Sequence, residues 1–354
     1  MKRQLLEKQT SHLYENPMAH IHGKSGSTKY LLNGIRPING KKLASLEEIQ
    51  HLYSHYEEIL AETESIVARQ HEGKILALGN EESRLAKELQ DRIAWRTIEV
   101  DTEIDNLNQK ITTADGFFAK TGCRVRYWVA VALRNHHIHG QFRNISIDLK
   151  NVQHEKAQRI RKKQDVIQWE RNNVAQSYKF LKSNETFLIR ANGEEDVINA
   201  LSWLPDDYNV INDVNFKFHP PIYWKKMNEY IITSQIDHIV AGPTGIFLLE
   251  TKNWKLVDII QKSDDLVYQV KRANHALWHH IKGHYAWKKS PTIRNVIVSI
   301  QGSSSEMKPD KYIDIVNPGR LCDYITRQDP ILSDEAVKKF VDIVTGKRLD
   351  FPRL

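Results

Sequence analysis

Residues 235–253 of the chain read QIDHIVAGPTGIFLLETKN. Apolar and β-branched side chains lie on both sides of a central Gly-Pro-Thr-Gly, residues 242–245. Two apolar runs separated by glycine and proline are typical of β-strands joined by a tight turn. The sequence therefore predicts a β-hairpin whose second strand ends near Lys252.

Three ionisable side chains of this hairpin are expected to lie together. Glu250 and Lys252 are two residues apart in a strand, so their side chains project from the same face. Asp237 lies on the preceding strand, and the hairpin would bring it beside Glu250. Two such carboxylates suit Mg²⁺ or Mn²⁺, which can polarise a phosphate and lower the pKa of a bound water. With the Lys252 ammonium they supply what phosphodiester hydrolysis needs, although an ordinary salt bridge is the plainer alternative.

The residues around this hairpin favour an α/β arrangement. β-branched runs also occur at 210–211, 231–232 and 296–300, and helical spacing occurs at 194–204 and 270–287. The expected order is helix, strand, strand, strand, helix, strand, which is typical of an α/β domain with a mixed sheet. A small helical tail is expected from Asp334 to Thr345.

The preceding part of the chain has the pattern of long helices. From Ser45 onward apolar residues recur at spacings of mostly three, four or seven, and Gly73 and Gly79 interrupt the run. A second stripe places four apolar residues seven apart, at Ile160, Ile167, Val174 and Leu181. Such spacing predicts heptad-rich helices, arranged either as an antiparallel hairpin or as an oligomeric coil.

Positive charge is concentrated in this helical part. The chain has a net charge of +7, but residues 120–163 hold eleven Lys or Arg against two acidic residues, a local excess of +9. Residues 191–354 carry 21 basic and 21 acidic side chains and are neutral. A basic block attracts polyanions and strengthens nucleic-acid binding by counterion release. The alternative is a solvated helical face.

The N-terminal residues 1–44 are rich in glycine, serine, lysine and asparagine, so we expect them to be poorly structured, with one short docked helix at most. Met1 to Ser11 is too polar for a secretory signal, and no apolar run approaches the ~20 residues needed to cross a bilayer. Cys123 and Cys322 cannot build a disulfide framework, which favours a reducing compartment. We therefore expect a cytoplasmic protein without membrane association.

Two further kinds of site receive little support. His275, His279, His280 and His284 include i,i+4 pairs on an expected helix, a spacing that can bind zinc. The glutamate of the HExxH motif is absent, so a polar helix face is the favoured interpretation. No glycine-rich phosphate-binding fingerprint occurs, and we expect no nucleotide cofactor.

Several residues extend the pattern around the hairpin. They are Asn192-Gly193-Glu194, then Val197, Ile198 and Leu201 at helical spacing, then Gly242-Pro243 and Gly245, and finally Glu250-Thr251-Lys252-Asn253. Over residues 190–300 this combination resembles the nuclease-related domain family, NERD, which is similar to the restriction-endonuclease-like PD-(D/E)xK superfamily. The resemblance covers roughly a third of the chain and is strongest at 235–253.

The resemblance implies roles for five residues. Asp237 and Glu250 match the metal-binding carboxylates of the family, and Lys252 matches its catalytic lysine. Glu194 matches an acidic residue of the first helix that can help hold the metal; the alternative is a first-turn charge that favours the helix dipole. Gln269 resembles a glutamine on the helix after the sheet, which would position a phosphate or the attacking water; the alternative is a surface amide.

Two stretches depart from the family pattern. The family usually has a glycine-rich turn after the lysine motif, whereas this chain has Trp254-Lys255-Leu256-Val257. Phe218 to Tyr230 is longer than a loop between paired strands needs to be. Both departures concern the substrate-facing edge rather than the metal site.

These observations predict an α+β protein. A long helical, coiled-coil N-terminal half at 45–188 precedes a restriction-endonuclease-like α/β domain with a mixed sheet and a helical tail at 189–354. The expected function is that of a metal-dependent endonuclease that forms homo-oligomers through its helices. DNA is favoured as the substrate, and an RNA-directed nuclease that uses the same chemistry is an alternative. Defence against invading DNA is the role suggested by analogy. The alternative is an inactive nucleic-acid-binding or scaffold protein that oligomerises through its coiled coil.

Overall fold

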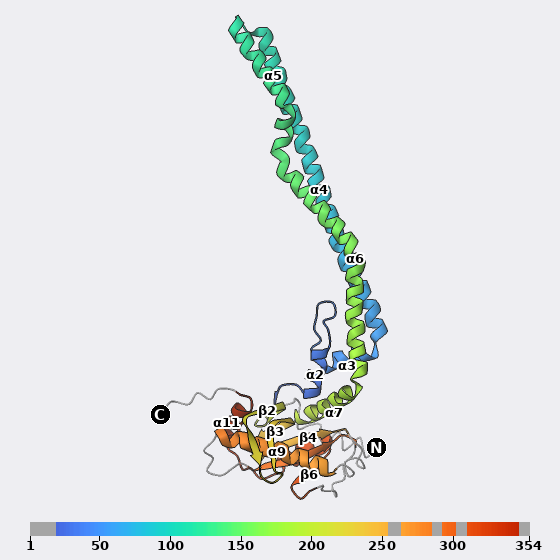
Figure 1. The fold of residues 1–354 in the computed structure, drawn as a ribbon, viewed down its shortest axis with the longest axis vertical. Coiled ribbons are helices and arrows are strands. Elements are labelled where there is room, and N and C mark those ends of the chain that lie inside the picture. Colours follow the sequence, from blue (N-terminus) through green and yellow to red (C-terminus); the bar gives the residue numbers. More distant parts are fainter. Residues whose placement is uncertain (1–18, 254–262, 285–291, 302–309, 347–354) are drawn as a thin grey trace, which may run out of the picture. The chain divides into compact units, whose positions relative to one another are not determined.

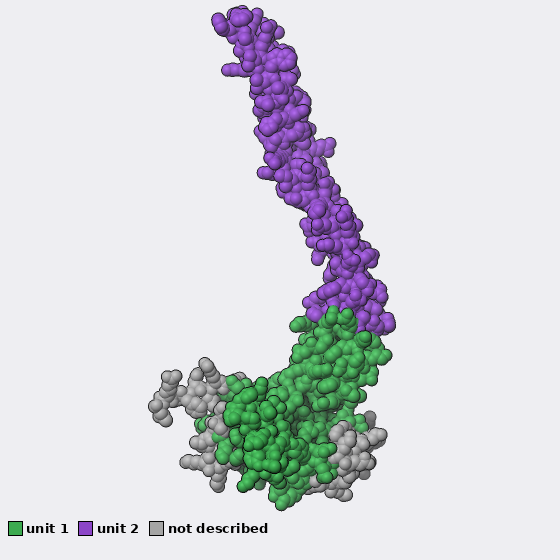
Figure 2. All heavy atoms as spheres, viewed as in Figure 1, with its two compact units in different colours: residues 1–36, 42–54, 176–354 green, residues 37–41, 55–175 purple. Residues whose placement is uncertain are grey.

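The computed structural model describes residues 19–253, 263–284, 292–301 and 310–346 of the 354-residue chain. The chain divides into two compact units (Figure 2). Unit 1 comprises Met1–Arg36, Lys42–Ser54 and Gln176–Leu354, and unit 2 comprises Pro37–Lys41 and His55–Ala175. These limits differ from the predicted boundaries after residues 44 and 188, because the N-terminal segment joins the C-terminal half.

Unit 1 is built on a mixed sheet that has six strands within the described residues, in the order β1-β2-β3-β4-β5-β6. The strands are β1 (His20–His22), β2 (Asn209–Trp224), β3 (Glu229–Gly242), β4 (Gly245–Lys252), β5 (Ile293–Ser299) and β6 (Ile313–Val316). β3 runs antiparallel to β2 and β4, while the pairs β1–β2, β4–β5 and β5–β6 are parallel. The predicted mixed sheet is confirmed.

Helices cover both faces of this sheet (Figure 1). They are α7 (Glu185–Leu201), α9 (Ser263–His284), α10 (Pro318–Thr326) and α11 (Asp334–Val344). α9 and α11 pack on the face that carries Leu248 and Ile297, which we call the α9 face. α7 and α10 pack on the face that carries Leu249 and Val298, which we call the α7 face. Burial on both sides explains the continuous apolar runs 246–249 in β4 and 296–298 in β5.

The predicted hairpin and the predicted order of elements are confirmed. Gly242 pairs with Gly245 at the turn, and Ile239 pairs with Leu248 further along. α11 also matches the expected helical tail. α7 begins at Glu185, so Glu194 lies inside the helix, and the alternative that it is a first-turn charge is wrong.

The loop expected at Phe218 to Tyr230 is mostly strand. β2 continues to Trp224, and β3 starts at Glu229. Two consecutive prolines obscure this strand in the sequence, and they lie where the β2–β3 register shifts, between Lys217 and Ile222. An irregularity of this kind is where a strand tolerates proline.

The N-terminal segment has more structure than expected. Residues 19–44 include β1 and the helix α2 (Gly26–Gly34), and α3 (Leu46–Ser54) follows. β1 pairs in parallel with the start of β2, through His20 and Asn209. Ser25 caps α2 by accepting a hydrogen bond from the backbone N–H of Thr28, as serine commonly does at this position.

Unit 2 is an antiparallel hairpin of long helices. Its elements are α4 (Tyr56–Thr113), α5 (Phe117–His139), the 3₁₀ turn Gly140–Phe142 and α6 (Arg143–Ser183) up to Ala175. Ion pairs join its two arms in antiparallel order: Glu64 with Arg171, Glu72 with Lys163, Glu82 with Lys156, and Asp101 with Arg134. The predicted helical half is confirmed in the form of a hairpin.

The predicted interruptions of the first long helix are wrong. Gly73 and Gly79 both lie inside α4. A glycine costs a helix only about 1 kcal/mol relative to alanine, which packing against the second arm offsets. None of the helices in the described ranges is long and apolar enough to cross a membrane.

Candidate active site

Asp237 and Glu250 lie opposite each other on β3 and β4. The antiparallel register pairs His238 with Leu249, so the next position brings Asp237 opposite Glu250. Directly paired residues share one face of a sheet, and Glu250 lies two residues after Leu248, on the α9 face. The pair is at the carboxyl end of β4, beside the parallel strand β5, which is where such sheets usually bind ligands.

Hydrogen bonds connect this pair with two further predicted residues. Oε1 of Glu250 accepts from Nζ of Lys252 at 2.7 Å and from Nε2 of Gln269 at 2.5 Å. Nζ of Lys252 also donates to Oε1 of Gln269 at 3.1 Å. The backbone N–H of Thr251 donates to Oδ2 of Asp237 at 2.9 Å. The structure therefore brings together Asp237, Glu250, Lys252 and Gln269.

Burial makes the negative charge of this pair costly. The Glu250 side chain is only 2 % exposed. Burial, followed by the nearby Asp237 carboxylate, raises the pKa of Glu250 to about 7, and Lys252 opposes this rise. Burial also raises the pKa of Asp237, against the Thr251 N–H and Lys252. Two adjacent carboxylates in a dry environment repel each other, so the pair favours a bound cation.

The donor atoms fit a divalent metal ion. Oδ1 of Asp237 and Oε2 of Glu250 make no hydrogen bond within the described residues. Mg²⁺ is commonly held by one or two carboxylates, with water and substrate phosphate as its other ligands. The described ranges contain no group of three or more His, Cys, Asp or Glu side chains that could hold a metal. Asp237 and Glu250 could therefore hold the metal as a two-carboxylate site.

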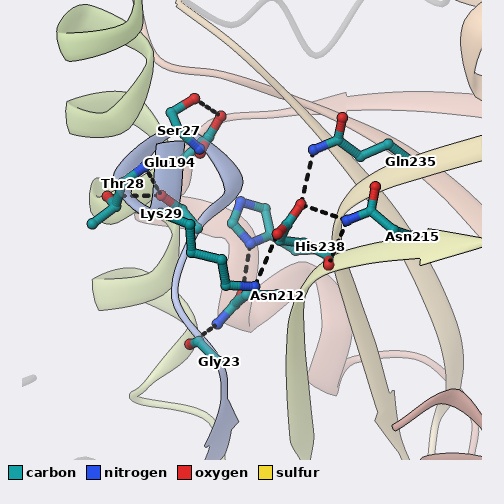
Figure 3. A network of polar contacts seen from close by, with 11 residues as sticks. Gly23, Ser27, Thr28, Lys29, Glu194, Asn212, Asn215, Gln235 and His238 are labelled. Atoms are coloured by element: carbon teal, nitrogen blue, oxygen red, sulfur yellow. Dashed lines mark hydrogen bonds and ion pairs between the residues drawn. The ribbon is translucent and has the colours of Figure 1, made fainter. Parts of the chain in front are cut away.

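Glu194, the fifth predicted residue, is not brought into this group. It is buried on α7, and its carboxylate contacts the first turn of α2 (Figure 3). Oε1 accepts from Oγ of Ser27 at 2.7 Å, and Oε2 accepts from the Ser27 backbone N–H at 3.1 Å. A helix N-terminus favours a negative charge, so this carboxylate anchors α2. To serve as a metal ligand, Glu194 would have to exchange this contact.

A second acidic residue, Asp213, holds the same N-terminal segment to the sheet. Figure 3 labels three of its partners, Lys29, Asn215 and Gln235. Its carboxylate accepts from Nζ of Lys29 at 2.9 Å, from Nδ2 of Asn215 at 2.9 Å and from Nε2 of Gln235 at 2.8 Å. A Cβ atom on Gly26 would lie 2.8 Å from Oδ1 of Asp213, so only glycine allows α2 to approach this closely. The segment thus packs directly on β2 and β3.

His238 completes this network from the strand that carries Asp237. Its Nδ1 donates to Oδ1 of Asn212 at 2.7 Å, and Nδ2 of Asn212 donates to the Gly23 carbonyl at 3.1 Å. Burial lowers the pKa of His238 to about 4, so the ring is neutral at neutral pH. Its contacts tie β3 to β2 and to the N-terminal segment, which is a structural role.

Two residues near the site were missed by sequence reasoning. Arg190 is exposed on α7, and its positive charge opposes the rise that burial causes in the pKa of both Asp237 and Glu250. The adjacent Ile189 carbonyl accepts from Nδ2 of Asn253 at 3.5 Å, which fixes this part of α7 beside the end of β4. Ser299 is buried and pairs in register with Lys252. A single arginine or serine gives no signal in sequence, because its proximity depends on the fold.

The histidines of α9 face aromatic rings of β2. The ring centroids of His275 and Trp224 are 5.6 Å apart, those of His279 and Phe218 6.1 Å, and those of His280 and Phe216 4.5 Å. These contacts give the three histidines a packing role. The His284 side chain and the stretch Trp254-Lys255-Leu256-Val257 lie outside what the structure describes.

Comparison with known proteins agrees with this geometry. The model of the family described as nuclease-related domain, NERD, matches residues 189–299. No curated protein and no solved structure matches the chain. The matched range runs from α7 to the end of β5 and contains Asp237, Glu250, Lys252 and Gln269. The resemblance seen in the sequence is confirmed: residues 189–299 of this chain match the nuclease-related domain family, NERD.

Proposed function

We propose that this protein is a metal-dependent nuclease that hydrolyses phosphodiester bonds. The observation that carries the proposal is the group formed by Asp237, Glu250, Lys252 and Gln269 within a nuclease-related domain. It combines two carboxylates, an ammonium and an amide at the carboxyl end of β4. These groups are sufficient for metal-assisted attack of water on a phosphodiester.

Each residue of the group has a distinct proposed role. Asp237 and Glu250 would hold Mg²⁺ or Mn²⁺, which when bound polarises the scissile phosphate and lowers the pKa of a water. Lys252 would orient the attacking water and stabilise the charge that develops on the phosphate. Gln269 contacts both Glu250 and Lys252, so it would hold their relative positions and reach the phosphate. Glu194 would assist the metal if Ser27 released it.

The proposed substrate is DNA rather than RNA, and the proposed state is a homo-oligomer formed through the helices. Cutting both strands of a duplex requires two active sites, which self-association would supply. We also propose a cytoplasmic location, in keeping with the free Cys123 and Cys322, and by analogy a role in defence against invading DNA.

The test is cleavage of plasmid DNA, and in parallel of a long RNA, by the purified full-length protein with Mg²⁺, Mn²⁺ or EDTA. We expect metal-dependent cutting of DNA that Asp237→Ala reduces by about 10²–10³-fold or more. Asp206→Ala removes an exposed carboxylate before β2 and serves as the matched control, which should cut like wild type. Cleavage of RNA alone would reject DNA as the substrate.

The alternative is a nucleic-acid-binding or scaffold protein whose nuclease fold is inactive. The presence of Asp237, Glu250 and Lys252 with their mutual contacts argues against it, since loss of activity usually removes such residues. Absence of cleavage by wild type, together with absence of metal binding in calorimetry, would favour this alternative.

A further inference from the structure

A cavity lies between α9, the end of the β2–β3 hairpin and the start of β5; we call it the α9 cavity. Its volume of about 490 Å³ falls within the range of about 300–1,000 Å³ that is usual for pockets that bind small molecules. Four of its lining residues share one face of α9, at positions i, i+3, i+4 and i+7: Lys271, Asn274, His275 and Trp278.

Aromatic rings form one wall of the α9 cavity. The His275 ring lies between two indoles, with its centroid 5.6 Å from that of Trp224 and 6.2 Å from that of Trp278. The interplanar angles of 18° and 22° make the three rings nearly parallel. Tyr312 lines the same cavity, is 64 % exposed and makes no ring contact with this wall within the described residues. Accessible flat rings favour a planar ligand.

Amide groups join the elements that surround the α9 cavity. Nδ2 of Asn274 on α9 donates to Oδ1 of Asn295 on β5 at 2.7 Å. Nδ2 of Asn295 donates in turn to the backbone carbonyl of Tyr312 at 3.4 Å. Oδ1 of Asn274 accepts no hydrogen bond from the described residues, so it remains available to a ligand. The cavity thus has a fixed shape and an accessible polar group.

The charged side chains of the α9 cavity are positive. Lys226 and Lys271 line it, and no acidic side chain of the described ranges does so. Lys271 donates to Asp310, outside the cavity. The hydrogen bond from Lys271 and, more weakly, the charge of Lys226 lower the pKa of Asp310. Two ammonium groups therefore share one carboxylate, which leaves a positive charge for an anionic ligand.

Two further lysines lie over the accessible rings. Nζ of Lys282 is 4.8 Å from the centre of the Trp278 ring, and Nζ of Lys311 is 4.6 Å from the centre of the Tyr312 ring. Lysine side chains are flexible and can move from a ring to a nearby phosphate. Aromatic rings interleaved with cations are the combination by which proteins bind unpaired nucleotides.

We propose that the α9 cavity binds a nucleotide, with its base against Trp278 and Tyr312 and its phosphate beside Lys226 and Lys271. Every base has a π-face for the rings, and its edge offers hydrogen-bonding groups to Asn274. A quaternary ammonium also binds to aromatic rings, but the lysines would repel it. The site needs no glycine-rich loop, because lysine side chains rather than backbone N–H groups meet the phosphate.

This cavity and the active site lie on opposite sides of α9. Successive residues of a helix are about 100° apart around its axis, so Lys271 and Trp278 point roughly 160–180° away from Gln269. The α9 cavity is therefore a second site, and the proposal does not depend on the nuclease chemistry. A free nucleotide and an unpaired nucleotide of a strand present the same base and phosphate to it.

The test is calorimetry of the full-length protein in EDTA with AMP, GMP, CMP and UMP. Ribose 5-phosphate lacks the base and adenosine lacks the phosphate, so each should bind about tenfold more weakly than the best nucleotide. A short single strand that binds where no monophosphate does, and more tightly than the same strand without bases, identifies the ligand as part of a strand. Absence of binding by all nucleotides and by the strand, or equal binding without the base, overturns the proposal.

Variants locate the bound nucleotide. Tyr312→Ala should weaken binding by about tenfold, and Tyr312→Phe should preserve it, because stacking needs only the ring. Tyr230→Ala is the matched control: Tyr230 is 66 % exposed, contacts the Tyr223 ring and does not line the cavity. Lys226→Ala should weaken the binding of monophosphates but not that of adenosine.

One further variant separates this site from the active site. Asp237→Ala should bind nucleotides like wild type, whatever its effect on cleavage, which is scored separately. Loss of nucleotide binding in Asp237→Ala, or wild-type binding by Tyr312→Ala, would place the nucleotide elsewhere and overturn the α9 cavity as its site.

Discussion

Glu250 combines deep burial with a nearby carboxylate and two hydrogen-bond donors. Its pKa rises from an ordinary 4.5 to about 7, so the folded protein holds a proton that the unfolded chain releases. Glu250 therefore favours the folded state below about pH 4.5, and that contribution is lost as the pH rises towards 7. A metal ion and a proton compete for the same carboxylate oxygens, so metal binding should strengthen over the same interval.

The corresponding prediction concerns the metal-free protein. Between pH 5 and pH 8, the midpoint temperature of EDTA-treated wild type should fall further than that of Glu250→Gln, whose amide does not titrate. Saturating Mg²⁺ should raise the wild-type midpoint more at pH 8 than at pH 5. Thermal unfolding by circular dichroism measures both effects, and parallel pH profiles for the two proteins would contradict the assignment.

We expect Arg190 to contact the phosphate backbone of the proposed substrate. Its charge acts on both Asp237 and Glu250, and its guanidinium packs over the Phe187 ring at 5.7 Å. Arg190→Ala should raise the KM for DNA by about tenfold with a smaller change in kcat, because it removes one charge-assisted phosphate contact. The slope of log KM against log salt should fall by about one. Arg190→Lys should restore part of the lost affinity for DNA. An unchanged salt slope in Arg190→Ala would exclude a phosphate contact by Arg190.

For single residues, the sequence predicts the contacts between residues that lie close together in the chain. Asp237, Glu250 and Lys252 can be predicted because a tight turn and a spacing of two residues fix their shared face. The Glu194 contact cannot be predicted in the same way, because Ser27 lies 167 residues away in sequence. The resemblance to a family implied that Glu194 helps to hold the metal, but it could not identify Ser27 as the hydrogen-bond partner of this carboxylate.

Among the elements, α2 is held by two carboxylates, Asp213 through Lys29 and Glu194 through Ser27 in the first turn. Glu194→Ala leaves the N–H and hydroxyl of Ser27 without their buried acceptor and should reduce the free energy of unfolding by about 2–3 kcal/mol. Ser27→Ala keeps the backbone contact and should cost less. Urea unfolding measures the free energy of unfolding of both variants. If Glu194 instead acts mainly as a metal ligand, its replacement will weaken metal binding and leave stability in EDTA unchanged.

The elements that the sequence predicts well are long or locally defined. The 242–245 turn and the apolar run of β4 are visible directly, and so are the heptads of α6. β1 is missed because three residues carry no periodic signal, and it is stabilised by its partner β2. The outer half of β2 is missed because its two prolines normally end a strand, whereas here they occupy a register shift.

For the molecule as a whole, charge counted along the sequence overstates the basic block. Lys156, Lys163 and Arg134 belong to it, but each pairs with an acidic residue of α4. The local excess of +9 is thus partly neutralised across the hairpin, which a count within one segment cannot show. Residues far apart in sequence likewise share one sheet, and the N-terminal segment belongs to unit 1 for this reason.

We propose that Asp237 and Glu250 bind the metal while Lys252 acts on the reaction. The most direct measurement pairs Mn²⁺ calorimetry with plasmid cleavage for Lys252→Ala. Lys252 donates to Glu250 but is not itself a ligand, so the variant should bind Mn²⁺ about as well as wild type or better. Its cleavage rate should fall by about 10²–10³-fold. Cleavage by Lys252→Ala at the wild-type rate, or loss of its Mn²⁺ binding together with its activity, would contradict these roles.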